Sequence, residues 1–233
     1  MTLPARLFAL ICAFGPLPVL AQDNPVVVEL FTSQGCSSCP PADALMMRLT
    51  GRDDVIPLAL HVDYWDYIGW KDQFADPAYT KRQKAYAHVG GRRMIYTPQM
   101  VVNGQEDLVG AKGMELAELI AAHRAIVPRV RVVTQRDGDR LSVRVEPLAA
   151  PLKGPFNVHL VRYAPLRTVE ITKGENAGRR LDYANVVENW TVIGEWDGTG
   201  PAELSAEVTG PAPAVVLIQA KGPGAIVAAA RAE

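Results

Sequence analysis

The sequence predicts an α/β domain over residues 25–127, followed by an antiparallel β-sandwich domain over residues 128–233. The first region alternates apolar runs with segments of helical periodicity, which is typical of parallel strands joined by helices. The second region contains short strand-like runs punctuated by glycine and proline, which is typical of a sandwich. The expected order of elements in the first region is βαβαββα.

The first strand, helix and second strand are read from hydrophobic spacing. Residues 26–31 form a continuous apolar run, as expected of a strand buried on both faces of a sheet. Residues 42–49 show helical spacing, and Pro40 and Pro41 fall at the helix start, where proline is tolerated. Residues 55–62 form a second apolar run. The short connections predict parallel strands with a right-handed crossover.

Two short signals organise the rest of the first region. Asp76 and Pro77 form an N-cap and N1 pair, which opens a helix running to about residue 89. Asn103 and Gly104 form the strongest short hairpin signal in the chain. The remaining elements are expected to be a strand over residues 99–102, a returning strand over residues 106–109 and a closing helix over residues 113–127.

The second region contains alternating and apolar strand patterns without helical periodicity. Two runs flank a turn at Asp137 and Gly138, and the second of them alternates apolar with polar residues. The strands expected here cover residues 129–135, 140–146, 156–163, 185–193, 214–219 and 225–229.

The N-terminus has the pattern of a secretory signal over residues 1–21. Arg6 supplies the positive region, residues 7–20 are apolar, and cleavage is expected after about Ala21. A membrane anchor is the alternative, but about 20 uninterrupted apolar residues are needed to span a bilayer. We therefore expect a periplasmic or secreted protein in an oxidising compartment, with no stable membrane insertion after cleavage. The formal net charge of −1 gives no indication of a nucleic-acid partner.

The chain has three cysteines, of which Cys12 lies in the signal. Cys36 and Cys39 form a Cys-Ser-Ser-Cys motif between the first strand and the first helix, an arrangement in which a dithiol becomes redox-active. Cys36 is the candidate attacking thiol, because the helix dipole and free N–H groups stabilise a thiolate at a helix N-terminus. Cys39 would resolve the mixed disulfide.

Three alternatives for the Cys36–Cys39 pair remain open. A structural disulfide is one, although so short a loop gains little stability from cross-linking. The two thiolates are also a candidate Cu(I) site, with a histidine as third ligand. A non-catalytic binding module, in which the sandwich binds the partner, is the third.

Other candidate site residues surround this motif in the predicted fold. Glu29 is a lone carboxylate in an apolar strand; burial there would raise its pKa and let it take the proton from Cys39. The alternative is a structural role, with Glu29 at a strand edge or paired to a base. Tyr64, Trp65 and Trp70 belong to an aromatic cluster after the second strand, at the sheet edge that carries Cys36. We expect them to bind an extended polypeptide, with a satellite core under a loop as the alternative.

The element order, the Cys-x-x-Cys motif and Thr97-Pro98 before the third strand together resemble the thioredoxin fold. The resemblance implies a cis Pro98, with the backbone of Thr97 facing an extended substrate as a strand does. An ordinary trans proline at a strand start is the alternative. Ser37 and Ser38 differ from the Gly-Pro of thioredoxins, and Gly35 replaces their tryptophan, so the direction of exchange is not indicated.

The mature chain also resembles the bacterial family called domain of unknown function 1223. The residues that carry this resemblance lie in four segments, over residues 29–41, 61–66, 96–99 and 174–178 (Gly-Glu-Asn-Ala-Gly). The last segment has no role that the sequence indicates. Our expectation is an exported thiol–disulfide oxidoreductase acting on protein or small-molecule thiols. It needs no organic cofactor or metal, and a separate partner recycles its dithiol.

Overall fold

A computed structural model describes residues 24–232, so the predicted signal sequence lies outside the described residues. The elements follow one another as β1 (Val26–Thr32), α1 (Pro40–Leu49), β2 (Val55–His61), the 3-10 helix η1 (Asp66–Ile68), α2 (Pro77–Val89), β3 (Gln99–Val102), β4 (Glu106–Val109), α3 (Gly113–Arg124), β5 (Val130–Asp137), β6 (Arg140–Pro147), β7 (Phe156–Glu170), β8 (Arg180–Trp196), β9 (Ala202–Glu207), β10 (Ala214–Ala220) and β11 (Ile226–Ala232). The chain is therefore a mixed α/β protein.

The first eight elements have the predicted order, with η1 added after β2. β1 pairs in parallel with β2 and antiparallel with β3, and β3 pairs antiparallel with β4. Asn103 and Gly104 turn between β3 and β4 with φ of 45° and 67°, as the hairpin signal predicted. The side chain of Asp76 caps α2 by accepting a hydrogen bond from the Ala78 N–H at 2.7 Å.

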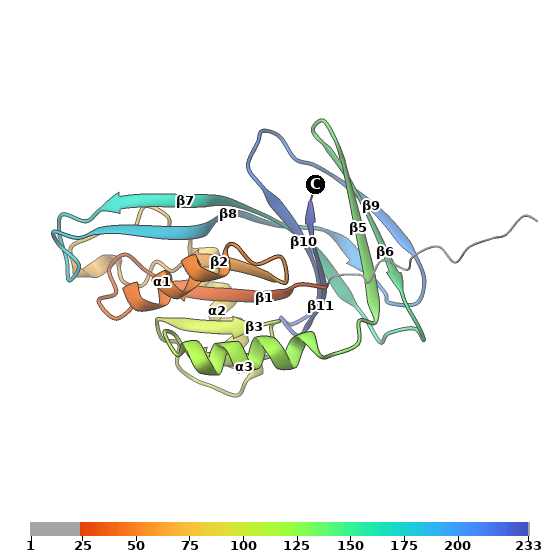
Figure 1. Cartoon of the computed structure of the whole chain (residues 1–233), viewed down its shortest axis with the longest axis horizontal. Helices are drawn as coiled ribbons and strands as arrows, with labels where there is room; N and C mark the ends of the chain where they lie inside the picture. Colours follow the sequence, from red (N-terminus) through yellow and green to blue (C-terminus); the bar gives the residue numbers. More distant parts are fainter. Residues whose placement is uncertain (1–23, 233) are drawn as a thin grey trace, which may run out of the picture.

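Strands from both regions of the chain form one large, mostly antiparallel sheet in the order β11-β10-β7-β8-β2-β1-β3-β4 (Figure 1). β2 and β8 join at a single residue pair, Ala59 with Val186. Pro57 in β2 has no N–H for a neighbouring strand, and its carbonyl instead accepts a hydrogen bond from the Asn185 side chain at 2.8 Å. This junction connects the two predicted domains through one sheet.

The remaining strands form a second, three-stranded sheet in the order β5-β6-β9. It packs over the β7, β10 and β11 end of the large sheet through a shared apolar cluster that includes Val132, Leu141, Phe156, Val216 and Ala228. The strands of the later region thus pair with one another in antiparallel fashion and lie in two layers. One of its layers belongs to the large sheet, however, so an independent sandwich is not confirmed. The predicted boundary between residues 127 and 128 stays a prediction.

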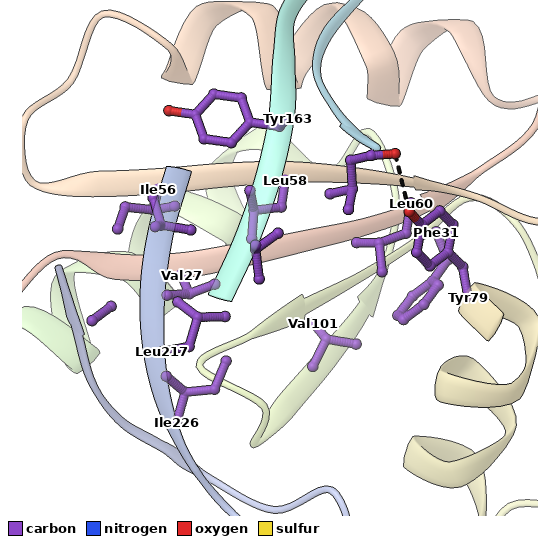
Figure 2. Packing of buried hydrophobic residues seen from close by; sticks show 14 of the residues in the cluster. Val27, Phe31, Ile56, Leu58, Leu60, Tyr79, Val101, Tyr163, Leu217 and Ile226 are labelled. Carbon is purple, nitrogen blue, oxygen red and sulfur yellow. Dashed lines mark hydrogen bonds between the residues drawn. The ribbon is translucent and has the colours of Figure 1, made fainter. Parts of the chain in front are cut away.

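The main core also mixes residues from both regions (Figure 2). Val27 and Leu58 from the first region pack in one cluster with Tyr163, Leu217 and Ile226 from the second. At the edge of this cluster the Tyr79 hydroxyl donates to the Val187 carbonyl at 3.1 Å. Because this buried surface is shared, the two regions hold each other in place.

The helices lie on opposite faces of the large sheet, and this placement decides what surrounds the cysteines. Val26, Val28 and Leu30 of β1 pack with α1 and α3. Val27 and Phe31, on the alternate positions, pack in the cluster that contains the α2 residues. Among residues 24–232, no helix is long and apolar enough to cross a membrane.

The later strands differ in extent from the prediction. β7 and β8 are longer than expected, and β9 was not predicted. Pro165 inside β7 and Asn185, with φ of 46° inside β8, are signals that normally end a strand. β9 consists largely of small and charged residues, which give a weak strand pattern. The long β7–β8 hairpin contacts α1 and carries its connecting loop, residues 171–179, towards the cysteines.

Candidate functional site

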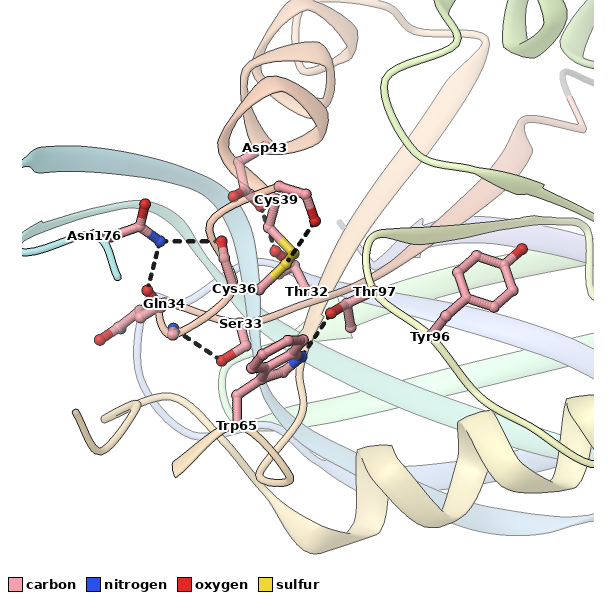
Figure 3. Close-up of a disulfide and its surroundings, with 12 residues drawn as sticks. Thr32, Ser33, Gln34, Cys36, Cys39, Asp43, Trp65, Tyr96, Thr97 and Asn176 are labelled. Atoms are coloured by element: carbon pink, nitrogen blue, oxygen red, sulfur yellow. Dashed lines mark hydrogen bonds between the residues drawn. A yellow bond between two sulfur atoms is a disulfide. The ribbon is translucent and has the colours of Figure 1, made fainter. Parts of the chain in front are cut away.

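Cys36 and Cys39 form a disulfide between β1 and α1, with their Cα atoms 5.4 Å apart (Figure 3). Both cysteines have an exposed fraction of 0%, whereas Ser37 and Ser38 between them are exposed. The disulfide therefore lies just beneath the surface. A reacting partner has to displace neighbouring groups to reach it.

The local environment of Cys36 differs from a free helix N-terminus. Cys39 is the N-cap of α1, so Cys36 lies three residues before it. Pro40 and Pro41 begin the helix without N–H groups, and the next two helical N–H groups bond to the Cys39 carbonyl. The expected free N–H donors are therefore largely missing. The Ser38 hydroxyl, 3.4 Å from the Cys36 sulfur, is placed to donate to a thiolate instead.

Asp43 lies on α1 one turn after Cys39 and is buried. Thr32 donates to one of its carboxyl oxygens at 2.9 Å, and the other oxygen has no hydrogen-bond partner among the described residues. Burial raises the pKa of Asp43 from 3.8 to about 7, and nearby His61 opposes this rise only in part. The Asp43 N–H bonds to the Cys39 carbonyl at 3.1 Å, so the two residues lie on adjacent turns of α1 (Figure 3). The Asp43 carboxyl group, with a pKa near neutral pH, thus lies one helical turn from the disulfide.

A second buried group connects β2 to the segment before Cys36. His61 Nδ1 lies 2.7 Å from a carboxylate oxygen of Asp72, and the same oxygen accepts the Gln34 N–H at 2.8 Å. The His61 ring packs edge-on against Phe74 and Tyr183. His61 is thus part of a polar network beneath the site.

The Gly-Glu-Asn-Ala-Gly segment reaches the disulfide from the far end of the chain. Asn176 donates from its side-chain nitrogen to the carbonyls of Gln34, at 2.9 Å, and Cys36, at 3.0 Å (Figure 3). Its side-chain oxygen accepts from Arg179 at 2.9 Å. This segment, to which sequence reasoning assigned no role, is therefore part of the site.

The Thr97–Pro98 peptide is cis, as the fold resemblance implied. Trp65 donates from its indole nitrogen to the Thr97 hydroxyl at 2.7 Å, and Figure 3 places its ring on the side of the disulfide that faces Thr97. A Cβ on Gly110 would lie 2.6 Å from the ring of Pro98, so only glycine fits there. The segment before β3 is thus packed tightly against its neighbours.

The predicted aromatic cluster is divided between two places. Trp65 stacks with Tyr67, which is 81% exposed, and Trp65 and Tyr64 pack against the main core. Trp70 donates to the Gln34 side chain at 2.8 Å, and Trp70 and Phe74, both partly buried, pack against a separate buried cluster. The alternative of a satellite core therefore describes this second group. Substrate binding by Tyr64, Trp65 and Trp70 stays a prediction.

Glu29 is buried, as expected, but it is paired. Its carboxylate binds Arg82 at 2.6 Å and accepts from the Tyr86 hydroxyl at 2.6 Å. Both partners lie on α2, because Glu29 alternates with Val27 and Phe31 on the face of β1 opposite α1. The pairing is the alternative that the sequence left open. A proton transfer from Cys39 to Glu29 stays a prediction.

This position allows a direct test of the two roles of Glu29. We expect Glu29→Gln to lower the free energy of unfolding by about 3 kcal/mol, because Arg82 loses its buried ionic partner. The rate of exchange with glutathione should stay within about twofold, since α1 lies on the other face. Urea unfolding and stopped-flow exchange measure these quantities. A large loss of exchange rate with unchanged stability would instead make Glu29 the proton acceptor.

Sequence reasoning missed Asp43, Asp72, Gln34 and Asn176. Asp43 follows Cys39 by four residues, and this helical spacing places both on one face, so a signal for Asp43 was present. The other three are brought to the site only by loops. Within residues 24–232, no group of three or more histidine, cysteine, aspartate or glutamate side chains is placed to hold a metal ion.

The profile of the family described as "Protein of unknown function (DUF1223)" matches residues 27–219. A crystal structure of a protein from Agrobacterium tumefaciens matches with a TM-score of 0.77 and 32% sequence identity, over 91% of this chain and 96% of that one. HBP35 of Porphyromonas gingivalis matches with a TM-score of 0.60 and 13% identity, over 90% of this chain and 74% of that one, which shows a shared fold alone. No curated protein matches this chain.

Proposed function

We propose that this chain, which belongs to the family of unknown function DUF1223, is a thioredoxin-like thiol–disulfide oxidoreductase. The observation that carries the proposal is the buried carboxyl group of Asp43, one helical turn after Cys39, whose carbonyl accepts the Asp43 N–H at 3.1 Å. Burying a carboxyl group without an ionic partner costs free energy, and a purely structural disulfide gains nothing from it. A dithiol that must release and take up protons does gain from such a group.

In the oxidising direction, a partner thiolate attacks the Cys36 sulfur. The Cys36–Cys39 bond breaks, its electron pair leaves on the Cys39 sulfur, and protonated Asp43 supplies a proton to that sulfur. A second partner thiolate then attacks the partner sulfur of the mixed disulfide, and Cys36 leaves as a thiolate. The partner is oxidised by two electrons to a disulfide, and the protein is left as the dithiol.

The reducing direction runs the same steps backwards. The Cys36 thiolate attacks a partner disulfide, the Asp43 carboxylate takes the proton from Cys39, and the Cys39 thiolate then releases the reduced partner. With a pKa of about 7, Asp43 is present in both protonation states near neutral pH, which suits either direction. The Ser38 hydroxyl stabilises the Cys36 thiolate in both.

The aromatic side chains next to Thr97 support a polypeptide substrate. An extended partner would pair with the backbone of Thr97 as an added strand. Trp65, which bonds to the Thr97 side chain, and exposed Tyr67 would form the nearby apolar wall. Because the disulfide is buried, partner binding has to move this wall. Protein or small-molecule thiols are the proposed substrates, and a separate partner recycles the dithiol.

We test the proposal by equilibrating residues 22–233 with glutathione buffers and trapping the cysteines with an alkylating reagent. The expected reduction potential lies between about −120 and −270 mV, with Cys36 reacting before Cys39. A bridge that resists reduction below about −300 mV would overturn the proposal and leave a structural disulfide. Export is proposed from the pattern of residues 1–21 and is tested by N-terminal sequencing of the protein recovered from the periplasm.

A further inference from the structure

Residues 171–179 form the loop between β7 and β8 and cover the segment that leads into the disulfide. We propose that Asn176, in this loop, is a positioning residue that sets the redox equilibrium between the Cys36–Cys39 disulfide and its dithiol. The inference rests on the proposed function, because it concerns the same cysteine pair. It assigns a role to the Gly-Glu-Asn-Ala-Gly segment.

Both polar atoms of the Asn176 side-chain amide make hydrogen bonds. Its nitrogen donates to the Gln34 and Cys36 carbonyls, and its oxygen accepts from Arg179. Asn176 is 1% exposed, so water does not compete for these hydrogen bonds. Only an amide side chain supplies two N–H donors from one nitrogen and an acceptor from the same planar group. The contacts therefore fix the orientation of the side chain.

The loop that carries Asn176 is itself held in shape. The Ile171 N–H bonds to the Arg179 carbonyl at 2.9 Å, and the Gly178 N–H bonds to the Ile171 carbonyl at 2.7 Å. Gly174 and Gly178 have φ of 77° and 80°, in the left-handed region that favours glycine. The hydrogen-bonding amide is thus presented by a closed turn rather than by an open loop.

The two carbonyls that Asn176 binds control the geometry of the disulfide ring. Gln34 lies inside the turn that the Cys36 N–H closes on the Ser33 carbonyl at 3.1 Å, and the Cys36 carbonyl accepts the Cys39 N–H at 3.2 Å, which closes the next turn, between the two cysteines. When the disulfide opens, this turn decides how close the two sulfurs stay. A turn held by Asn176 gives the Cys39 thiol a high effective concentration at Cys36, which favours ring closure.

Loss of Asn176 should therefore weaken ring closure. We expect Asn176→Ala to lower the equilibrium constant for disulfide formation against glutathione about tenfold, which makes the reduction potential about 30 mV less negative. The rate at which Cys39 resolves a mixed disulfide should fall by a similar factor. Arg179→Ala, which removes only the support of the amide oxygen, should give a smaller shift of about threefold.

Asn185→Ala is the matched control. Asn185, on β8, is another buried asparagine. Its side chain donates to the Pro57 carbonyl at 2.8 Å, in the junction between β2 and β8. Its positive φ makes alanine strained there, so this variant should lose at least as much stability as Asn176→Ala. The reduction potential of Asn185→Ala should remain that of the unsubstituted protein, because the lost hydrogen bond is to Pro57 on β2 and not to the segment that carries Cys36.

The outcomes separate this inference from the proposed function. Equal potentials for Asn176→Ala and the unsubstituted protein, or an equal shift in Asn185→Ala, overturn the positioning role. If Asn176→Ala does not fold, an unshifted potential in Arg179→Ala overturns it. A potential below about −300 mV in the unsubstituted protein overturns the proposed function. The difference between the variants still decides the role of Asn176 in that case.

Discussion

Cys36→Ser is expected to abolish disulfide exchange, whereas Cys39→Ser is expected to keep the first attack and to accumulate a mixed disulfide. The serine hydroxyl is a far weaker nucleophile than a thiolate at neutral pH, so the exchange rate of Cys36→Ser should fall at least about a thousandfold. Cys39→Ser retains the attacking thiol but lacks the group that releases the partner. Mass spectrometry after mixing with oxidised glutathione measures the adduct, and stopped-flow kinetics measure the rates.

Ser37→Ala is the control for this pair, because Ser37 is exposed and lies between the cysteines. It should exchange at close to the rate of the unsubstituted protein. If Cys39→Ser formed no adduct with glutathione while the unsubstituted protein was reducible, the assignment of Cys36 as the attacking residue would be wrong. Normal function of Cys36→Ser in cells would favour the non-catalytic binding module.

Asp43→Asn is expected to slow the resolving step by about a hundredfold at pH 7, because asparagine cannot take the proton from Cys39. In the unsubstituted protein this step should accelerate as the pH rises through about 7, the pKa of the buried carboxyl group, and level off above it. The variant should lose that inflection. Single-turnover release from a preformed mixed disulfide, followed between pH 5 and pH 9, measures both effects.

The same carboxyl group makes a prediction about stability. Its pKa in the folded protein, about 7, lies above its ordinary value of 3.8, so the folded state binds more protons than the unfolded state between these values. Stability should therefore fall by a few kcal/mol as the pH rises from about 4 to about 7. Asp43→Asn should remove this contribution, and urea unfolding across the pH range measures it.

Glu29→Gln is the matched control, since it neutralises another buried carboxylate on the opposite face of β1. It should keep the inflection in the resolving step near pH 7. A resolving rate in Asp43→Asn equal to that of the unsubstituted protein, with the same pH profile, would contradict proton transfer through Asp43. The exchange would then rely on solvent to deprotonate Cys39.

Local sequence signals suffice for some of the elements. The strand–helix–strand start and the Asn103-Gly104 hairpin were predictable, because hydrophobic period and turn chemistry act over a few residues. Asn185 and Pro165 misled the prediction of β7 and β8. Their local preference for breaking a strand is overridden by pairing across a long hairpin.

The position of the Cys36–Cys39 pair between a strand and a helix was predictable, since both elements follow from local patterns. The apolar run around Glu29 also indicated a strand that is buried on both faces. The pairing of Glu29 with Arg82 was not predictable, because it depends on the face of the sheet on which α2 packs. Only the tertiary structure brought Asn176 to the Cys36 carbonyl, across 140 residues. A contact of that span depends on a sheet shared by both regions, which no local pattern of residues encodes.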